Sequence, residues 1–210
     1  MVIWSVSINA GDSAITSESV PTRLLPDILR RSLDVVFCGI NPGLSAARAG
    51  HHFSSPSNRF WRVLHLAGFT PRLIPPESDR TILQYGYGLT AAVERPTVRA
   101  SELTSREFHE AAEELERKLR RYSPRFVAFL GKAACAAILR QKSVDWGQQS
   151  VEFGGAEVWV LPNPSGLNRA FSLQELVIAY RELRAVSKGD RFKSQLVPRL
   201  PISSRGLLGR

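Results

Sequence analysis

Three apolar runs constrain most strongly what this chain can fold into. They are DVVFCGI (34–40), RFVAFLG (125–131) and AEVWVLP (156–162). A strand that is apolar along its whole length is buried on both faces, as in a parallel sheet that helices cover. A fourth run, GLTAAV (88–93), is compatible with either a short strand or a loop.

Segments with a helical spacing of apolar residues alternate with these runs. They are NRFWRVLHLAG (58–68), TSREFHEAAEELERKLRRY (104–122), GKAACAAILR (131–140) and SLQELVIAYRELRAV (172–186). Two of them begin with a capping box, formed by Thr104 with Glu107 and by Ser172 with Glu175. Strands that alternate with helices predict an α/β fold with a largely parallel sheet.

The chain has an excess of positive charge. It carries 28 Lys and Arg residues against 19 Asp and Glu residues, which gives a net charge of +9. This excess favours a polyanionic partner, nucleic acid before membrane, although charge alone is also compatible with a role in solubility. No apolar run approaches the ~18–20 residues of a membrane-spanning helix, and the N-terminus lacks the regions of a signal peptide. We therefore expect a cytoplasmic protein with no membrane partner.

The cysteines and histidines give no sign of a metal centre. Cys38 and Cys135 lie in apolar segments, and we expect both to be small buried side chains. They form no CxxC pair, and the four histidines have no metal-ligand spacing. We therefore expect no metal, no iron–sulfur cluster and no other cofactor.

The sequence predicts three parts along the chain. An N-terminal extension at 1–30 is polar without a sustained period, and we expect it to be partly disordered. A compact domain follows at 31–187. The tail at 188–210 holds six Lys or Arg residues and one acid, Asp190, and we expect it to be disordered. This tail is either a basic arm for a polyanion or a solvated terminus without a function.

Two strand ends carry the same turn signal, Asn-Pro followed closely by Gly. They are GINPG (39–43) and LPNPSG (161–166). Parallel strands end at one edge of their sheet, where open α/β folds bind ligands, so Asn41 and Asn163 are predicted to face one crevice. Each turn taken alone is also ordinary turn chemistry. Amides donate and accept hydrogen bonds but are not bases, which suits a planar heterocycle and a good leaving group.

These motifs resemble those of a known family. GINPG (39–43) and NPSGLNR (163–169) are similar to the two signature motifs of the mismatch-specific uracil-DNA glycosylases, the Mug and thymine-DNA glycosylase family. PSNRFWRVLHLAGFT, GLT…VERPTV and FLGKAA resemble other stretches of bacterial members in the same order. The resemblance covers about residues 34–186, and the combination is far more specific than a single NPG.

The resemblance implies a fold and an activity. The fold is a three-layer α/β/α sandwich, and the protein is a monomer without a metal or cofactor. The activity is hydrolysis of the N-glycosidic bond of uracil, or of adducts such as ethenocytosine, opposite guanine in double-stranded DNA. A base inside a duplex must be flipped out to be reached, and flipping costs least at a mismatch.

The resemblance also assigns roles at the pocket. Asn41 matches the residue that positions the attacking water, and Phe53 matches the aromatic residue on which the flipped base stacks. The backbone of Gly39 and Ile40 is expected to meet the edge of the base, and Asn163 is expected to face the base or its sugar. Because the first position is Asn rather than Asp, we expect slow catalysis that depends on the leaving ability of the base.

A second set of residues is expected to contact DNA around the pocket. The expected wedge, which fills the gap in the duplex and contacts the orphan guanine, consists of Gly166, Leu167, Asn168 and Arg169. The candidate phosphate contacts are Ser45, Ser165 and Lys132.

Two positions near the expected pocket need separate treatment. Ala91 stands where several relatives carry Lys or Asn, and this difference would narrow or shift the range of accepted bases. Glu94 is a candidate auxiliary group for the attacking water. A salt bridge with Arg95 or another Arg is the alternative role for Glu94.

Three other functions are compatible with parts of the sequence. One is a glycosylase that prefers single-stranded uracil or deaminated purines. Another is a non-catalytic protein that binds mismatches or abasic sites. The last is a small-nucleotide-binding α/β protein, which is disfavoured because the chain has neither GxGxxG nor a P-loop.

Overall fold

The structure is a computed structural model that describes residues 24–189. The remaining residues of the expected extension and tail lie outside this range. Part of the expected extension packs on the domain, because Ile28 is buried and exchanges two backbone hydrogen bonds of 2.9 Å with Leu89. The packed part of the chain therefore begins before residue 31.

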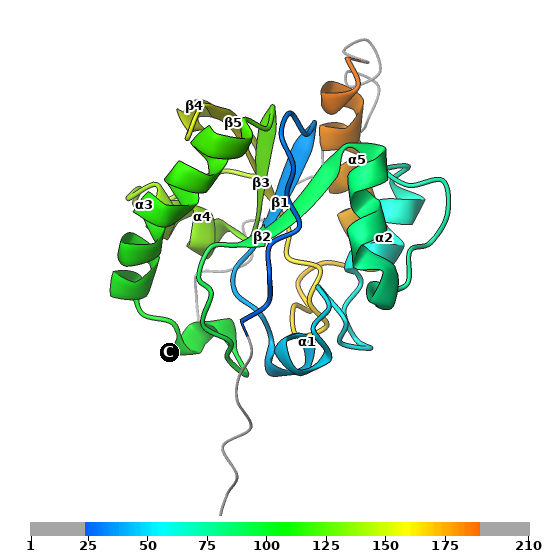
Figure 1. The fold of residues 1–210 in the computed structure, drawn as a ribbon, viewed down its shortest axis with the longest axis horizontal. Helices are drawn as coiled ribbons and strands as arrows, with labels where there is room; N and C mark the ends of the chain where they lie inside the picture. The colour runs from blue at the N-terminus through cyan, green and yellow to red at the C-terminus, as the bar shows by residue number, and fades with distance from the viewer. Residues whose placement is uncertain (1–23, 190–210) are drawn as a thin grey trace, which may run out of the picture.

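Five strands form one sheet in the order β2-β1-β3-β5-β4 (Figure 1). The strands are β1 (Val35–Gly39), β2 (Tyr87–Ala91), β3 (Phe126–Leu130), β4 (Gly147–Phe153) and β5 (Ala156–Leu161). Neighbouring strands pair in parallel except β4, which pairs with β5 in the antiparallel direction at one edge. β1 and β3 are buried at every position, as expected for central strands of a covered parallel sheet.

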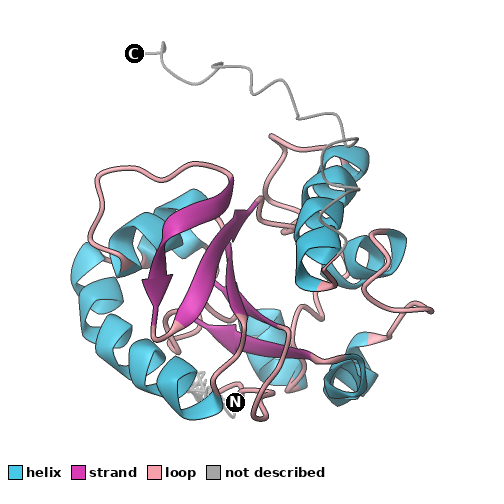
Figure 2. Ribbon diagram, turned by 90° about the horizontal axis from the view of Figure 1, so that it is seen from above, coloured by secondary structure: helices cyan, strands magenta, loops and turns pink. Residues whose placement is uncertain are grey.

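Helices cover both faces of this sheet (Figure 2). One face carries α2 (Phe60–Leu66) and α5 (Leu173–Ser187), and the other carries α3 (Ser105–Tyr122) and α4 (Lys132–Ile138). The side chains of β1 alternate between the two: Phe37 packs with the core under α2 and α5, and Cys38 packs with the core under α3 and α4. The expected α/β/α sandwich is therefore confirmed.

The long periodic helices begin where their caps predicted. Thr104 and Ser172 are the N-caps of α3 and α5, and each completes a capping box with the Glu three residues later. Both caps place the apolar face of the helix against the sheet, with Leu115 and Leu119 buried in α3. No helix within residues 24–189 is both long and apolar enough to cross a membrane.

Some elements were not expected from the sequence. They are α1 (Leu44–Ala49), the 3₁₀ segments η1 (Pro76–Tyr85) and η2 (Ala100–Glu102), and strand β4. β4 reads GQQSVEF and has few strand-forming residues. It forms because Gly154 and Gly155, both with positive φ (59° and 79°), turn the chain back to pair with β5.

Candidate functional site

A cavity of about 850 Å³ opens at the C-terminal edge of the sheet. Its walls come from the end of β1, the end of β2, the loop after α1 and the loop between β5 and α5. In Figure 1, α1 and the yellow loop before α5 lie side by side below the sheet. Asn41 and Asn163 both line this cavity, so the expected convergence of the two Asn-Pro turns is observed.

The side chain of Asn41 is held in one orientation. Its Nδ2 donates to the carbonyl oxygen of Arg95 (2.8 Å) and to Oγ1 of Thr97 (2.7 Å). A carbonyl oxygen can only accept, so the nitrogen must face Arg95 and the amide cannot be flipped. Both amide hydrogens are used, and Oδ1 remains as the acceptor. Asn41 therefore offers a hydrogen-bond acceptor that can orient a water molecule.

A chain of contacts fixes the two partners of Asn41. Buried Thr97 donates its hydroxyl hydrogen to the carbonyl of Arg99 (2.9 Å), so its oxygen faces Asn41 as an acceptor. The guanidinium of Arg95 donates to Glu107 at 2.6 Å. This hydrogen bond, together with one from the backbone of Thr104, lowers the pKa of Glu107 to about 2. The Asn41 amide is therefore connected to the N-terminus of α3.

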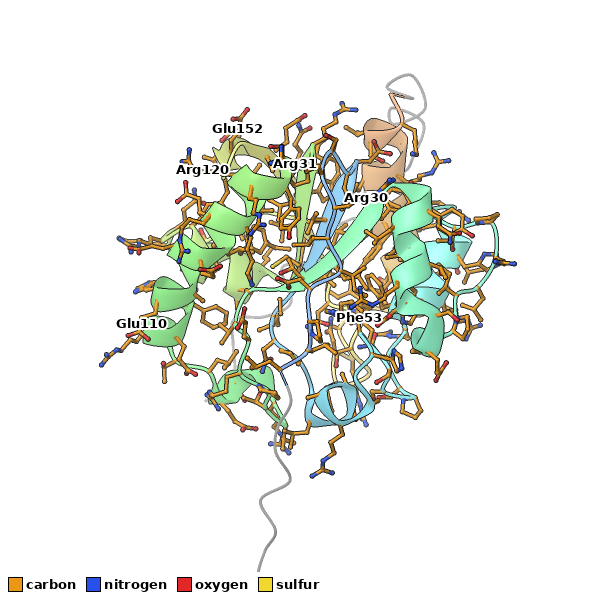
Figure 3. The ribbon with its side chains drawn as sticks, viewed as in Figure 1. Arg30, Arg31, Phe53, Glu110, Arg120 and Glu152 are labelled. Atoms are coloured by element: carbon orange, nitrogen blue, oxygen red, sulfur yellow. The ribbon has the colours of Figure 1, made fainter. Side chains whose placement is uncertain are left out.

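Phe53 forms an aromatic surface in the cavity. Its ring stacks on Phe60 of α2 with centroids 3.9 Å apart and planes at 26°. Gly39 lies at the ring edge, where an added Cβ would be 3.6 Å from two ring carbons. Phe53 has a positive φ of 56°, an uncommon conformation for a non-glycine residue. Figure 3 shows Phe53 within the molecule, whereas the labelled Glu110 and Arg120 point outward.

The loop that carries Phe53 is held in place by hydrogen bonds at His52. The carboxylate of Asp79 accepts from the His52 backbone N–H (2.9 Å), and the His52 carbonyl accepts from the Trp61 ring N–H (3.0 Å). His52 Nε2 lies 2.9 Å from the carbonyl of Pro26, so this nitrogen carries a hydrogen. Burial lowers the pKa of His52, which favours the neutral ring. His52 therefore acts as a brace rather than as a charged group.

The segment 162–171, here called the 162–171 loop, is a tight turn built on amides. Oδ1 of Asn163 accepts from the backbone N–H of Ser165 (2.9 Å), and its carbonyl accepts from Nδ2 of Asn168 (2.8 Å). The Nδ2 group of Asn163 makes no hydrogen bond within the described residues. Because Asn163 lines the cavity, it offers a donor where Asn41 offers an acceptor.

The tip of the 162–171 loop places a leucine at the cavity mouth. Gly166 lies so close to Ser57 that an added Cβ would be 2.5 Å from the Ser57 Cβ and 2.7 Å from its carbonyl oxygen. Leu167 follows and is 73% exposed, the highest value for a large apolar side chain within residues 24–189. Leu167 is the apolar residue of the expected wedge, and its side chain is accessible to a partner.

The other expected contacts divide into two groups. Ser45 and Ser165 line the cavity, and Arg169 is exposed beside it. Lys132 lies apart from the cavity wall: it pairs with Asp145 (3.8 Å) and lies 4.9 Å from the centre of the Trp146 ring. Its charge is thus already engaged.

Glu94 also lies outside the cavity wall. It pairs with Lys118 at 2.7 Å, on the side of β2 that faces α3. Lys118 also contacts Asp27 at 2.9 Å, and Asp27 accepts from the hydroxyl of Thr90 on the pocket wall. The expected ion pair with an Arg is therefore wrong, because Arg95 is taken by Glu107. Glu94 has the structural role that was the alternative to assisting a water.

Ala91 ends β2 on the cavity wall, and Gly39, which ends β1, and Ile40, which follows it, line the cavity beside it. The carbonyls of Gly39 and Ile40 accept backbone hydrogen bonds from Ala92 (2.8 Å) and Val93 (3.0 Å). The short side chain of Ala91 leaves the floor of the cavity without a charged group at this position.

One functional residue had no sequence signal. Arg59 donates to four sites in the 162–171 loop: Nε to Pro164 (3.3 Å), Nη1 to Phe171 (2.7 Å), and Nη2 to Ser165 (3.1 Å) and Asn168 (2.8 Å). All four acceptors are backbone carbonyls. An Arg that precedes a helix in a polar loop is ordinarily a solvated residue, so its role becomes visible only in three dimensions.

The site contains neither a cysteine nucleophile nor a metal-binding cluster among the residues described. Burial raises the pKa of Cys135 to about 12 and raises that of Cys38 further, so both thiols stay protonated. No group of three or more His, Cys, Asp or Glu residues within 24–189 could hold a metal ion. The side chains that converge on the cavity are thus mainly amides, hydroxyls and an aromatic ring.

An α/β/α sandwich with a pocket at its strand ends belongs to the α/β proteins that bind ligands at this edge, and the aromatic ring and amides of this pocket suit a planar heterocycle. Comparison with known proteins makes this class specific. The chain belongs to the uracil DNA glycosylase superfamily, whose family model matches residues 26–184.

The fold is similar to the solution NMR structure of a candidate uracil DNA glycosylase from Methanosarcina acetivorans. The TM-score is 0.53 and the identity is 23%, and the match covers 78% of this chain and 98% of that chain. Superfamily membership implies DNA glycosylase activity on uracil. The expected class of DNA-repair hydrolase is thus confirmed.

Proposed function

We propose that this protein is a mismatch-directed uracil-DNA glycosylase. It removes uracil, and adducts such as ethenocytosine, from opposite guanine in double-stranded DNA, and it acts as a monomer. The observation that carries the proposal is the fixed amide of Asn41. Its two N–H groups are bound by Arg95 and Thr97, and its Oδ1 is left as an acceptor on the cavity wall.

The flipped base lies on the ring of Phe53, which is supported from behind by Phe60. The Nδ2 group of Asn163 donates to an oxygen of the base or its sugar, and the backbone at Gly39 and Ile40 meets the edge of the base. Stacking on an aromatic ring and hydrogen bonds to fixed groups are the usual ways in which glycosylases hold a flipped base. Ser45 and Ser165 contact the flanking phosphates.

The reaction is hydrolysis at the sugar carbon. Oδ1 of Asn41 accepts a hydrogen bond from a water molecule and directs its oxygen toward C1′. The bond between C1′ and the base nitrogen breaks, and its electron pair leaves with the base as an anion. The water oxygen forms the new bond to C1′, and the proton that this water loses passes through solvent to the base anion. An amide neither takes the proton nor carries a charge, so the rate depends on how well the base leaves.

The preference for a mismatch follows from the cost of flipping. A mispaired base gives up less pairing energy when it leaves the stack, so U·G is favoured over U·A. Leu167 enters the duplex to fill the gap, and Arg169 and the backbone of the 162–171 loop contact the orphan guanine and its strand. The mouth of the cavity already presents this leucine at 73% exposure.

The test is a substrate panel with the full chain. Base release is measured, as cleavage at abasic sites in alkali, from duplexes that contain U·G, U·A, T·G or ethenocytosine·G and from single-stranded uracil DNA. We expect release from U·G to exceed release from U·A and from the single strand. A preference for single-stranded uracil or deaminated purines would contradict mismatch direction. Binding to mismatched or abasic DNA without release of any base would instead indicate a non-catalytic binder.

A further inference from the structure

Arg59 connects the two loops that form the cavity. It lies directly before Phe60, which supports the Phe53 ring, and its side chain reaches across to the 162–171 loop. Besides the four side-chain hydrogen bonds to that loop, its backbone N–H donates to the carbonyl of Pro164 (3.0 Å). Arg59 thus makes five donor contacts to a single loop that lies more than a hundred positions away in the sequence.

No other residue within 24–189 ties the middle of that loop to the body of the protein by a hydrogen bond. Between Asn163 and Ala170, the remaining hydrogen bonds run within the loop itself, for example from Asn168 to Asn163. These internal bonds define the shape of the turn but not its place in the molecule. The two ends of the loop are anchored, since the Tyr180 hydroxyl donates to the Pro162 carbonyl (3.3 Å) and the Phe171 ring packs on Trp146. Its middle is placed by Arg59 and by the close contact of Gly166 with Ser57.

The chemistry of arginine is essential to this arrangement. Arg59 is half-buried and its guanidinium forms no ion pair with any described residue, so its hydrogen-bond partners there are backbone carbonyls. A planar fork with five donors can reach carbonyls at Pro164, Ser165 and Phe171 at the same time. Lysine has the same charge, but its donors are on a single nitrogen atom, so it cannot reach these separate carbonyls at the same time.

We infer that Arg59 is a positioning residue of the glycosylase site: it holds the 162–171 loop so that Leu167 enters the duplex and Asn163 faces the flipped base. The inference rests on the proposed function. Arg59 is not among the residues that line the cavity. It acts through the loop, and its loss is therefore expected to affect flipping and the chemical step more than the initial binding of DNA.

The experiment compares the full chain with Arg59→Lys and Arg59→Ala. The matched control is Arg184→Lys, because Arg184 is also half-buried and donates to a backbone carbonyl, that of Gly68 (3.0 Å), away from the cavity. Three quantities are measured: the single-turnover rate of uracil release from U·G, the Kd for a duplex with non-cleavable 2′-fluoro-uridine, and the fluorescence of 2-aminopurine beside the uracil. Thermal unfolding reports whether each variant is folded at the assay temperature.

For Arg59→Lys we expect a rate about 10- to 100-fold lower than native, since a small displacement of a positioning loop has effects of this size. We expect its Kd to stay within about twofold, because the charge is kept, and the 2-aminopurine signal to fall. Free guanidinium at millimolar concentration is expected to restore part of the rate of Arg59→Ala. Arg184→Lys is expected to match the native protein in all three measurements.

The inference is overturned if Arg59→Lys releases uracil at the native rate. It is also overturned if the rate and the Kd change by the same factor, or if Arg59→Lys is unfolded at the assay temperature, since the residue would then serve the fold rather than the loop. These outcomes differ from failure of the proposed function. In that case the native protein itself releases no uracil from any substrate.

Discussion

At the scale of single residues, the site uses two asparagines in opposite senses. Asn41 has its donors bound and its acceptor open, whereas Asn163 has its acceptor bound and its donor open. The identity of the residue is the same, and the neighbours decide which half of the amide meets the ligand. This division of roles gives the cavity wall one open amide acceptor and one open amide donor, beside the charged side chain of Arg99.

The role of Asn163 can be tested by Asn163→Asp. A carboxylate keeps the acceptor for the Ser165 backbone N–H, so the turn and its thermal stability are expected to stay close to native. It replaces the open donor by an acceptor, which repels the oxygens of uracil, and we expect about a 10-fold or larger fall in the single-turnover rate. Asn163→Ala is expected to lose both turn stability and rate. An Asp variant that is as fast as the native protein would show that the Asn163 donor does not contact the base.

The two asparagines also show what sequence can say about a site. Their placement after strands predicted a shared pocket, because parallel strands end at one edge. Which amide hydrogen bonds they make was beyond prediction, since Arg95 and Thr97 are more than fifty positions from Asn41. Arg59 could not be recognised from the sequence either, because its acceptors are backbone carbonyls, which every residue has.

At the scale of elements, helices with a capping box and a helical spacing over many residues were predictable, whereas short helices and the edge strand were not. α3 and α5 begin at their predicted capping boxes. α1 has six residues and no side-chain cap, and β4 has a polar sequence that forms a strand only because β5 pairs with it. Elements stabilised by tertiary contacts leave little trace in local sequence.

The capping box of α3 has a consequence for stability against pH. Glu107 accepts from Arg95 and from the backbone of Thr104, and its pKa falls from 4.5 to about 2 in the folded protein. A carboxyl group with a depressed folded pKa contributes stability above its unfolded pKa, and that contribution is lost as the pH falls from about 4.5 to about 2. We expect Glu107→Gln to have a lower free energy of unfolding than the native protein at neutral pH. We also expect its free energy of unfolding to fall less between pH 4.5 and pH 2.

Urea unfolding at several pH values between 2 and 7 measures this effect. The control is Glu113→Gln, since Glu113 is an exposed glutamate of the same helix with no hydrogen bond or ion pair to any described residue. Its acid dependence is expected to follow that of the native protein. If the Glu107→Gln and native profiles stay parallel from pH 5 to pH 2, the Arg95 contact does not lower this pKa in the folded state.

At the scale of the whole molecule, the sandwich brings distant segments to one edge. Asn41 follows β1, Phe53 precedes α2, and Asn163 and Leu167 follow β5, and all four line one cavity. Among the residues described, Arg59 and the contact of Gly166 with Ser57 join the segment after β5 to the segment before α2. A net charge of +9 suits the phosphate backbone that surrounds a flipped nucleotide.

The central claim is that the fixed amide of Asn41 directs the water that cleaves the glycosidic bond. The most direct test is single-turnover release of uracil from a U·G duplex by the native protein and by Asn41→Ala, with duplex binding measured in parallel. The account predicts a rate lower by about 100-fold or more, with binding close to native because the 162–171 loop is untouched. Release at the native rate by Asn41→Ala would contradict it, because another group would then have to direct the water.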